Sequence, residues 1–224
     1  MLEPTVKYDS KTANYFEDCR DEMAAYVPAS AQKMLEIGCG NAAFAQRLKA
    51  SRLIHVTAVE AHPPAAAVAS QRVDRLVQRA WDDALPELLG ERFDCIVMND
   101  VLEHLVDPWT VLTQLQGLLT KDGCVVASIP NVRYVPVLKE YLQEAQFRYR
   151  QDGVMDRTHL RFFTKKSMLD MFSATGYRVD RIDGINGVRL PWKLAMLNFV
   201  TRQAFADTQF KQFACVARLS AEAQ

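Results

Sequence analysis

Two glutamates and two glycines in the first sixty residues have the types and spacing to bind a cofactor. Glu36 precedes Gly38 and Gly40 in the segment Glu36-Ile-Gly-Cys-Gly, and Glu60 follows Gly40 by twenty residues. Apolar residues before the glycines and before Glu60 indicate two buried strands, joined by a glycine turn and a helix. Glycine lets the backbone approach a ligand because no Cβ intervenes. A carboxylate at a strand end suits a pair of ribose hydroxyls, so we expect half of a nucleotide-type cofactor site.

Glu36 discriminates between two classes of cofactor. A dinucleotide places a pyrophosphate over this glycine turn, where a carboxylate would repel it. S-adenosylmethionine (SAM) carries a sulfonium and an ammonium instead, and a carboxylate attracts both. Glu36 therefore favours SAM. Because Gly38-x-Gly40-x-x-Ala43 also fits the dinucleotide fingerprint, an NAD-dependent oxidoreductase stays open at this point.

Asn99 and Asp100 follow a continuous apolar segment at residues 93–98, which predicts a central parallel strand. We expect both side chains to reach the methionine part of SAM, with Val101 contributing backbone beside them. The alternative role for Asp100 is to cap a following helix. The segment lacks the Asn/Asp-Pro-Pro-Tyr/Trp motif used for exocyclic amines of bases, which argues against an adenine or cytosine N-methyltransferase.

His104 and His159 are the candidate general bases. Methyl transfer to oxygen is an in-line displacement at carbon, so the enzyme mainly aligns the nucleophile and removes a proton. Histidine suits this task near neutral pH. His104 lies just after the 93–98 strand, and His159 follows Asp156 by three residues in a segment expected to cover the site. For each histidine the alternative role is a hydrogen bond to a loop backbone.

Basic and aromatic residues alternate in the second half of the chain. They predict a pocket for an anionic substrate, such as a nucleotide-sugar or a phosphorylated glycan. An RNA-binding surface and a solvated helix with a buried aromatic face are the two alternatives. The residues are Arg148, Arg150, Arg157 and Arg161, with Phe147, Tyr149, Phe162 and Phe163 between them.

The elements that position these residues alternate between strand and helix, which predicts an α/β fold with a parallel doubly wound sheet. Helix caps are expected at Asp107, Thr164 and Gly176. Residues 81–83 are expected in a loop and residues 121–123 in a turn. Strands are expected at residues 34–37, 54–59, 76–77, 93–98, 124–129, 177–182 and 212–219, and helices at 13–26, 42–50, 63–70, 107–119, 164–176 and 192–205.

Composition narrows the class of protein. The chain has 224 residues, enough for one α/β domain with a sizeable core. Lys plus Arg balances Asp plus Glu at 27 each, so no global field recruits nucleic acid or an acidic membrane. No apolar run approaches the roughly 20 residues that span a bilayer, and the first residues lack a signal-peptide core, so we expect a cytoplasmic location. The five cysteines contain no Cys-x-x-Cys pair, which argues against a zinc site or a disulfide framework.

Taken together, these segments resemble a class I SAM-dependent methyltransferase over nearly the whole chain. The resemblance rests on L-E-I-G-C-G at residues 35–40, the acid at Glu60, D-V-L-E-H-L at 100–105 and the segment 118–131. D-R-T-H-L-R-F-F-T at 156–164 is similar to a signature of the type 11/12/23-like subgroup, often encoded with glycosyltransferases or acting on sugars and small metabolites. The resemblance implies a Rossmann-like seven-stranded sheet in the order 3-2-1-4-5-7-6, with strand 7 antiparallel and a cap after strand 5.

The resemblance also implies a set of site residues, with two departures. Ala42 stands where relatives often have a third glycine, and Ala80 stands where they commonly carry an acid for the adenine amino group. Trp81 or Asp82 is expected to serve the adenine instead. The expected cofactor-binding residues are Glu36, Gly38, Gly40, Glu60, Ala61, Ala80, Trp81, Asn99, Asp100, Val101 and His104, and the expected substrate-binding residues are Tyr15, Arg20, Asn131, Arg157 and Arg161.

The sequence thus predicts a single domain of residues 1–224. Residues 1–30 are expected to form an N-terminal helical cover, 131–163 a cap or lid insertion and 185–206 a helical insertion. The predicted function is methyl transfer from SAM to a hydroxyl or amine of a small metabolite or a sugar or glycan precursor. The alternatives are an NAD-dependent oxidoreductase and a non-catalytic SAM-fold binding protein. The expected partners are the substrate and a second copy in a homodimer, without metal, nucleic acid or membrane.

Overall fold

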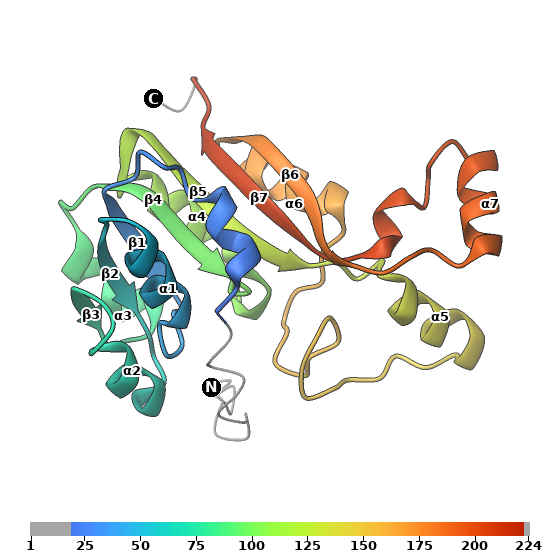
Figure 1. Cartoon of the computed structure of the whole chain (residues 1–224), viewed down its shortest axis with the longest axis horizontal. Helices are drawn as coiled ribbons and strands as arrows, with labels where there is room; N and C mark the ends of the chain where they lie inside the picture. The colour runs from blue at the N-terminus through green and yellow to red at the C-terminus, as the bar shows by residue number, and fades with distance from the viewer. Residues whose placement is uncertain (1–18, 222–224) are drawn as a thin grey trace.

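The computed structural model describes residues 19–221, which form a seven-stranded sheet with helices on both faces (Figure 1). The strand order is β3-β2-β1-β4-β5-β7-β6. β1 to β5 pair in parallel, and β7 pairs antiparallel with both β5 and β6, which confirms the predicted topology. The strands are β1 (Lys33–Ile37), β2 (His55–Val59), β3 (Arg75–Val77), β4 (Phe93–Asn99), β5 (Leu119–Pro130), β6 (Tyr177–Gly187) and β7 (Phe210–Leu219).

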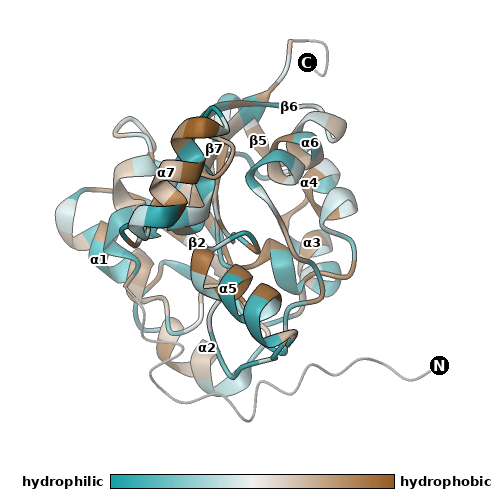
Figure 2. Cartoon of the chain, turned by 90° about the vertical axis from the view of Figure 1, so that its right-hand side faces the viewer, coloured by the Kyte–Doolittle hydropathy of each residue, from teal (hydrophilic) through white to brown (hydrophobic). Residues whose placement is uncertain are grey.

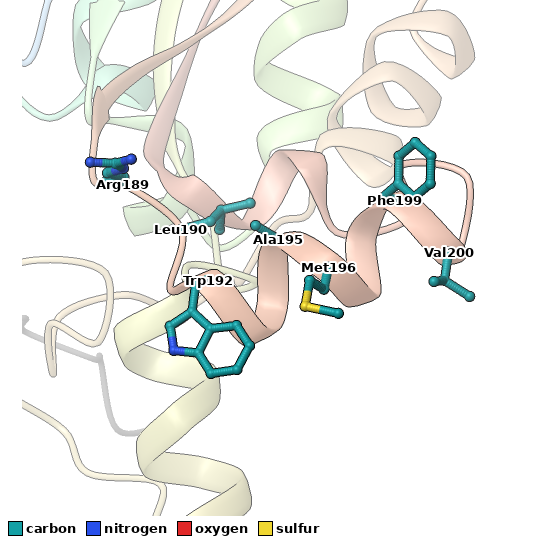
Figure 3. Close-up of a pocket in the computed structure, with 7 residues that line it drawn as sticks. All are labelled: Arg189, Leu190, Trp192, Ala195, Met196, Phe199 and Val200. Carbon is teal, nitrogen blue, oxygen red and sulfur yellow. The ribbon is translucent and has the colours of Figure 1, made fainter.

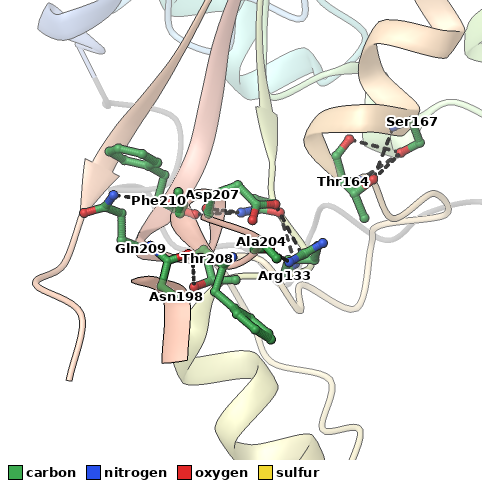
Figure 4. Close-up of polar contacts among 12 residues, drawn as sticks. Arg133, Thr164, Ser167, Asn198, Ala204, Asp207, Thr208, Gln209 and Phe210 are labelled. Carbon is green, nitrogen blue, oxygen red and sulfur yellow. Dashed lines mark hydrogen bonds and ion pairs between the residues drawn. The ribbon is translucent and has the colours of Figure 1, made fainter. Parts of the chain in front are cut away.

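The helices begin and end at several of the predicted capping residues. At the start of α4 the Asp107 side chain accepts a hydrogen bond from the Thr110 amide. Thr164 and Ser167 form a capping box at the start of α6 (Figure 4), and Gly176 follows that helix with a φ of 77°. The helices are α1 (Ala43–Ser51), α2 (Pro63–Ala69), α3 (Trp81–Leu88), α4 (Pro108–Gln116), α5 (Val135–Glu144), α6 (Lys165–Ala174) and α7 (Trp192–Val200), with 3-10 turns η3 (Asp21–Tyr26), η4 (Leu102–His104) and η5 (Ala206–Gln209).

Successive residues of the central strands point into two cores, one on each face of the sheet. Leu35 of β1 lies in a cluster with Leu112 of α4 and Phe172 of α6. Met34, its neighbour, lies in the other cluster with Phe44 of α1. Because both faces are covered, residues 95–98 of β4 form a continuous apolar segment rather than an alternating one.

The start of α3 and the end of α4 differ from the prediction. Residues 81–83 begin α3 instead of lying in a loop, because Trp81, Ala84 and Leu88 present one buried face and two acids favour the first turn. The predicted helix at 107–119 ends at Gln116, and β5 already begins at Leu119.

Residues 121–123, predicted as a turn, belong to β5. The register between β4 and β5 shifts between Phe93 and Cys95, so the additional residues of β5 bulge at this point. A Cβ on Gly123 would lie 2.9 Å from the Phe93 carbonyl oxygen. Gly123 therefore allows the close approach of the two strands rather than a chain reversal.

The predicted N-terminal helix at residues 13–26 is described only from residue 19 onward. Its described part is the 3-10 turn η3, preceded by Arg20 in a left-handed conformation with a φ of 45°. Met23 and Tyr26 of η3 are buried in the cluster on the α1 side of the sheet. The described part of the N-terminal segment thus covers one face of the sheet.

α5 and α7 stand at one end of the molecule, away from β1, β2 and β3 (Figures 1 and 2). α7 ends at Val200, so the predicted helix at 192–205 is shorter than expected. Polar contacts hold this end together (Figure 4): Arg133 pairs with Asp207 at 3.2 Å and donates to the Ala204 carbonyl at 2.7 Å, and the Asn198 side chain accepts from the Phe205 amide at 2.8 Å. No helix within residues 19–221 is long and apolar enough to cross a membrane.

Candidate cofactor and catalytic site

The glycine turn after β1 has a backbone geometry that glycine adopts without strain. Gly38 and Gly40 have φ values of 66° and 54°. The Gly38 amide donates to the Val59 carbonyl at 2.9 Å, and a Cβ on Gly38 would lie 2.8 Å from Cγ2 of Val101. This close packing brings the turn against the segment after β4, so the two regions predicted to bind the cofactor lie together.

Glu60 holds the same turn from the end of β2. Its carboxylate accepts hydrogen bonds from the amides of Gly40 and His62, each at 2.7 Å. Burial raises the pKa of Glu60, and these amide bonds oppose that shift. The carboxylate lies at the ligand edge of the parallel sheet, and each oxygen keeps a further lone pair for a hydroxyl group. Ala61, the next residue, is exposed.

Glu36 is the more strained carboxylate of the two. Its side chain is 3% exposed, and its Oε2 has no hydrogen-bond partner among residues 19–221. Burial and, second, the charge of Glu60 raise the pKa of Glu36 to about 8. Buried carboxylates that repel each other are relieved by a nearby cation. The unpaired oxygen is chemically suited to the sulfonium and ammonium charges of SAM.

The expected adenine side has one buried and two exposed positions. The Trp81 side chain is buried, and its Nε1 donates to Gln114 Oε1 at 2.7 Å, which fastens α3 to α4. Ala80 and Asp82 on either side of Trp81 are exposed. An acid beside the adenine would therefore come from Asp82, and the indole ring lies in the core.

The end of β4 carries one unpaired and one heavily paired side chain. Neither Nδ2 nor Oδ1 of Asn99 has a hydrogen-bond partner in the described part of the chain. Asp100, with a φ of 54°, forms an ion pair with Arg20 and accepts hydrogen bonds from Gln212 at 2.6 Å and Ser128 at 3.0 Å. The alternative role for Asp100 is absent, because no side chain caps η4. Arg20, predicted to bind substrate, thus ties the N-terminal cover to the end of β4.

His104 and His159 come from distant segments and meet beside the end of β4. Their ring centroids are 4.7 Å apart in an edge-on arrangement. His104 Nδ1 lies 3.1 Å from the Thr158 carbonyl oxygen, and His159 Nδ1 lies 3.0 Å from the Val154 carbonyl oxygen. A carbonyl only accepts, so each Nδ1 carries the proton and donates, and the basic lone pair is on Nε2. The predicted hydrogen bonds to loop backbone exist, and they set the tautomer of each ring.

Glu103 is a residue of this site that the sequence prediction missed. It is 1% exposed, and its carboxylate oxygens have no hydrogen-bond partner within residues 19–221. Burial and, second, the charge of Asp100 raise the pKa of Glu103 well above its usual range. Its Oε1 lies 3.9 Å from His159 Nε2. The signal in the sequence was a carboxylate next to His104 inside an otherwise apolar motif.

The four arginines of the insertion do not form one pocket. Arg148 and Arg150 pair with Glu140 of α5, at 3.5 Å and 2.6 Å, and are more than half exposed. Arg157 is exposed, and Arg161 donates to a backbone carbonyl. Arg148 and Arg150 are therefore neutralised by an acid of the insertion, whereas Arg157 and Arg161 flank His159 in the sequence.

Two further residues, Asn131 and Tyr15, were predicted to bind the substrate. Asn131 is fully buried, and its Nδ2 donates to the carbonyls of Asp207 and Phe210, at 2.9 Å and 3.0 Å. Asn131 therefore ties the start of the 131–163 insertion to η5 and the start of β7, and its amide nitrogen is occupied by these two carbonyls. Tyr15 lies outside the described residues. The ring of Phe162 packs beside that of His159, and the two ring centroids lie 6.3 Å apart.

An apolar hollow of about 700 Å³ lies on α7 and the segment that precedes it (Figure 3). Trp192 and Phe199 are 69% and 79% exposed there. Figure 2 shows hydrophobic segments of α7 and α5 at the same end of the molecule. The hollow is lined by Arg189, Leu190, Trp192, Ala195, Met196, Phe199 and Val200.

Comparisons of the sequence with known proteins all identify methyltransferases. Residues 8–182 match a family model described as a methyltransferase domain. The chain is 38% identical over 102 residues to the uncharacterized methyltransferase Rv0089 of Mycobacterium tuberculosis, a match that covers 44% of this chain and 51% of that protein. The chain thus spans about half the length of these mycobacterial relatives. It is 26% identical over 192 residues to the ubiquinone biosynthesis O-methyltransferase of Cereibacter sphaeroides, covering 80% and 76%.

Solved structures share the fold at low sequence identity. A SAM-dependent methyltransferase from Archaeoglobus fulgidus has a TM-score of 0.63 and 15% identity, over 92% of this chain and 94% of that one. Magnesium protoporphyrin IX methyltransferase (ChlM) from Synechocystis, with S-adenosylhomocysteine bound, has a TM-score of 0.60 and 11% identity, over 93% and 83%. At these identities the likeness concerns the fold.

Proposed function

From the premise that this chain belongs to the methyltransferase domain family, among the class I SAM-dependent methyltransferases, we propose that it transfers the methyl group of SAM to a hydroxyl group of a small metabolite or a sugar or glycan precursor. The observation that carries the proposal is the pair of buried carboxylates at the glycine turn. Glu36 has an unpaired oxygen that a cation would satisfy, and Glu60 stands at the strand end where ribose hydroxyls bind. The arrangement supports SAM better than a dinucleotide, whose pyrophosphate would add a third negative group.

In this proposal the cofactor lies along the carboxyl ends of β1, β2 and β4. Glu60 accepts hydrogen bonds from the ribose hydroxyls, and Glu36 lies near the positive end of SAM. The amide of Asn99, which lacks a partner among the described residues, binds the methionine part. Ala80 and Asp82, both exposed at the start of α3, face the adenine.

The acceptor hydroxyl is proposed to lie beside His104 and His159. The methyl carbon moves in line from sulfur to the acceptor oxygen, and the sulfonium becomes a neutral thioether. The hydroxyl proton must leave, and the Nε2 atoms of the two histidines carry the basic lone pairs that can take it. An amine acceptor would require the same proton removal, so it remains the second acceptor class.

Two observations support the proposed substrate class. The similarity to a ubiquinone biosynthesis O-methyltransferase over most of the chain favours an oxygen acceptor. The 156–164 signature favours a sugar or small metabolite. We propose that residues 131–163 and 185–206 form the acceptor-side cap, with Arg157, Arg161 and the apolar face of α7 selecting the substrate.

Calorimetry on the purified, cofactor-stripped chain tests the cofactor assignment. We expect SAM and S-adenosylhomocysteine to bind with micromolar affinity and NAD not to bind. Glu60→Ala should weaken SAM binding by about two orders of magnitude, whereas Glu87→Ala, an exposed glutamate of α3, should leave it unchanged. Unchanged SAM affinity in Glu60→Ala would contradict the contact between Glu60 and the ribose. Binding of NAD alone would contradict the methyltransferase proposal and favour an oxidoreductase.

A further inference from the structure

We propose that Glu103, His104 and His159 form a binding site for one divalent first-row transition-metal ion, such as Zn²⁺ or Mn²⁺, that coordinates the acceptor hydroxyl. One ligand atom from each residue lies within 4.8 Å of the other two. The three come from η4, directly after β4, and from the loop of the 131–163 insertion. This inference rests on the proposed function and concerns how the same cluster activates the acceptor.

The Glu103 carboxylate is the observation that points to a ligand. It is 1% exposed, and neither oxygen has a hydrogen-bond partner among residues 19–221. A buried carboxylate is costly to the fold unless it is paired or bound to a metal. His159 Nε2, at 3.9 Å from Oε1, is beyond hydrogen-bond distance, so the two residues do not form a proton-sharing pair. A cation between these atoms would satisfy both.

The two imidazoles have the tautomer that a metal site requires. Each Nδ1–H donates to a backbone carbonyl, Thr158 for His104 and Val154 for His159. Metal-binding histidines almost always donate their second N–H to a carbonyl or a carboxylate, which fixes the ring and directs the other nitrogen to the ion. The loop that carries His159 is also tied to Glu103, whose carbonyl accepts from the amides of Leu160 and Arg161 at 2.8 Å and 3.0 Å.

The distances between the three ligand atoms suit one metal ion if the side chains move closer together. Metal–ligand bonds of about 2.0–2.2 Å place neighbouring ligand atoms roughly 3.0–3.5 Å apart. The 3.9 Å between Glu103 Oε1 and His159 Nε2 is close to this range, and ligand atoms at the 4.8 Å limit of the cluster must approach each other by about 1.3–1.8 Å through side-chain rotation. Two imidazoles and one carboxylate leave open positions on Zn²⁺ or Mn²⁺.

An open coordination position explains what the ion would do. A hydroxyl bound there loses its proton to water more readily, because the ion stabilises the oxyanion as a Lewis acid. That oxygen then attacks the methyl carbon of SAM, and the sulfonium leaves as a thioether. When the ion is bound, His104 and His159 act as its ligands. The ion, instead of a histidine, then favours deprotonation of the acceptor hydroxyl. The sequence predicted no metal, because a glutamate, its neighbouring histidine and a distant histidine match no spacing signature.

Metal binding to the untagged, chelator-stripped chain is the test. We expect calorimetry to give one equivalent of Zn²⁺ per chain and electron paramagnetic resonance to report Mn²⁺ competing for the same site. Glu103→Gln, which keeps the volume of the side chain, and His159→Ala should each weaken binding about 10- to 100-fold. His55→Ala, in a half-exposed histidine at the start of β2, is the control and should bind as the wild type does.

Thermal stability and ligand titrations decide the inference. Zn²⁺ should also raise the melting temperature of the wild type and of His55→Ala, and raise that of Glu103→Gln by less at the same Zn²⁺ concentration. Absence of saturable binding, or equal affinity in Glu103→Gln and His159→Ala, overturns the metal site. SAM titrations on the same samples separate the two proposals: SAM binding without metal binding leaves the methyltransferase proposal and the histidine bases intact, whereas loss of both contradicts the proposed function itself.

Discussion

The cofactor edge and the α5–α7 end of this molecule are built in different ways. At the carboxyl ends of β1, β2 and β4, charged groups are buried and packing fixes their positions, as for Glu36, Glu60 and Glu103. At the other end, α7 buries Asn198 and exposes most of its large apolar side chains. The first region stores unfavourable electrostatic energy that ligands would relieve. The second exposes apolar surface that a substrate or partner would cover.

The largest expected effect concerns the pH dependence of stability at the cofactor edge. The pKa of Glu36 is about 8 in the folded chain, above its ordinary value of 4.5, so the folded state holds a proton that the unfolded state releases between these values. Stability therefore falls as pH rises from about 4.5 to about 8, by up to about 1.4 kcal/mol per pH unit. Urea unfolding across this range measures the slope.

Glu36→Gln removes one titrating group and should reduce the slope, while Glu60 and Glu103, whose pKa values burial also raises, keep their contributions. Glu87→Gln, in an exposed glutamate of α3, should leave the wild-type slope unchanged. Saturating SAM should also reduce the slope, because the cation favours the charged form of Glu36. A wild-type profile without a decline in this range would show that Glu36 is not the strained carboxylate described above.

The second effect concerns the attachment of the N-terminal cover to the end of β4. Arg20 is 8% exposed and pairs with Asp100, so Arg20→Ala leaves a partly buried carboxylate without its cation. We expect a loss of about 3 kcal/mol in the free energy of unfolding. Arg47→Ala, which breaks the exposed pair with Asp21 at 3.1 Å, should cost under about 1 kcal/mol. Equal losses in the two variants would mean that the cover is held by apolar packing alone.

The third effect tests the close approach at the glycine turn. Gly38→Ala combines a φ of +66° with a Cβ only 2.8 Å from Val101, whereas Gly90→Ala has a φ of +89° and nothing within 4 Å. Backbone strain alone should cost about 1 kcal/mol in Gly90→Ala. Overpacking should add about 1–3 kcal/mol in Gly38→Ala and weaken SAM binding. Chemical denaturation and SAM calorimetry on both variants separate strain from packing.

The contrast between local patterns and tertiary packing explains which parts of the fold the sequence predicted. The fold at the cofactor edge was predictable because it depends on local patterns: a glycine turn at Gly38, an acid at a strand end, and alternating strands and helices whose order follows from the resemblance. Where residues 81–83 and 121–123 were assigned wrongly, tertiary packing decided the outcome. Trp81 started a helix because its ring could be buried, and Gly123 allowed close strand pairing rather than a turn.

The contacts of the candidate site that join distant segments were not predictable. Nothing local in the sequence shows that Arg20 reaches Asp100, that Asn131 is saturated by backbone carbonyls, or that Glu103 faces His159. Each of these contacts depends on how the 131–163 insertion and the N-terminal cover fold back on the sheet. Residue type identified the candidates, and the three-dimensional arrangement assigned their roles.

The smallest expected effect lies at the α5–α7 end. Phe199→Ser removes a large apolar side chain that is 79% exposed, so the free energy of unfolding should change by less than about 0.5 kcal/mol in urea titrations. Met171→Ala on α6, where the side chain is 1% exposed, should cost about 2–5 kcal/mol. If α7 selects the acceptor, Phe199→Ser should raise KM for the acceptor and leave SAM affinity unchanged. A loss of stability comparable to that of Met171→Ala would mean instead that α7 belongs to the folded core, and the contrast between the two ends would disappear.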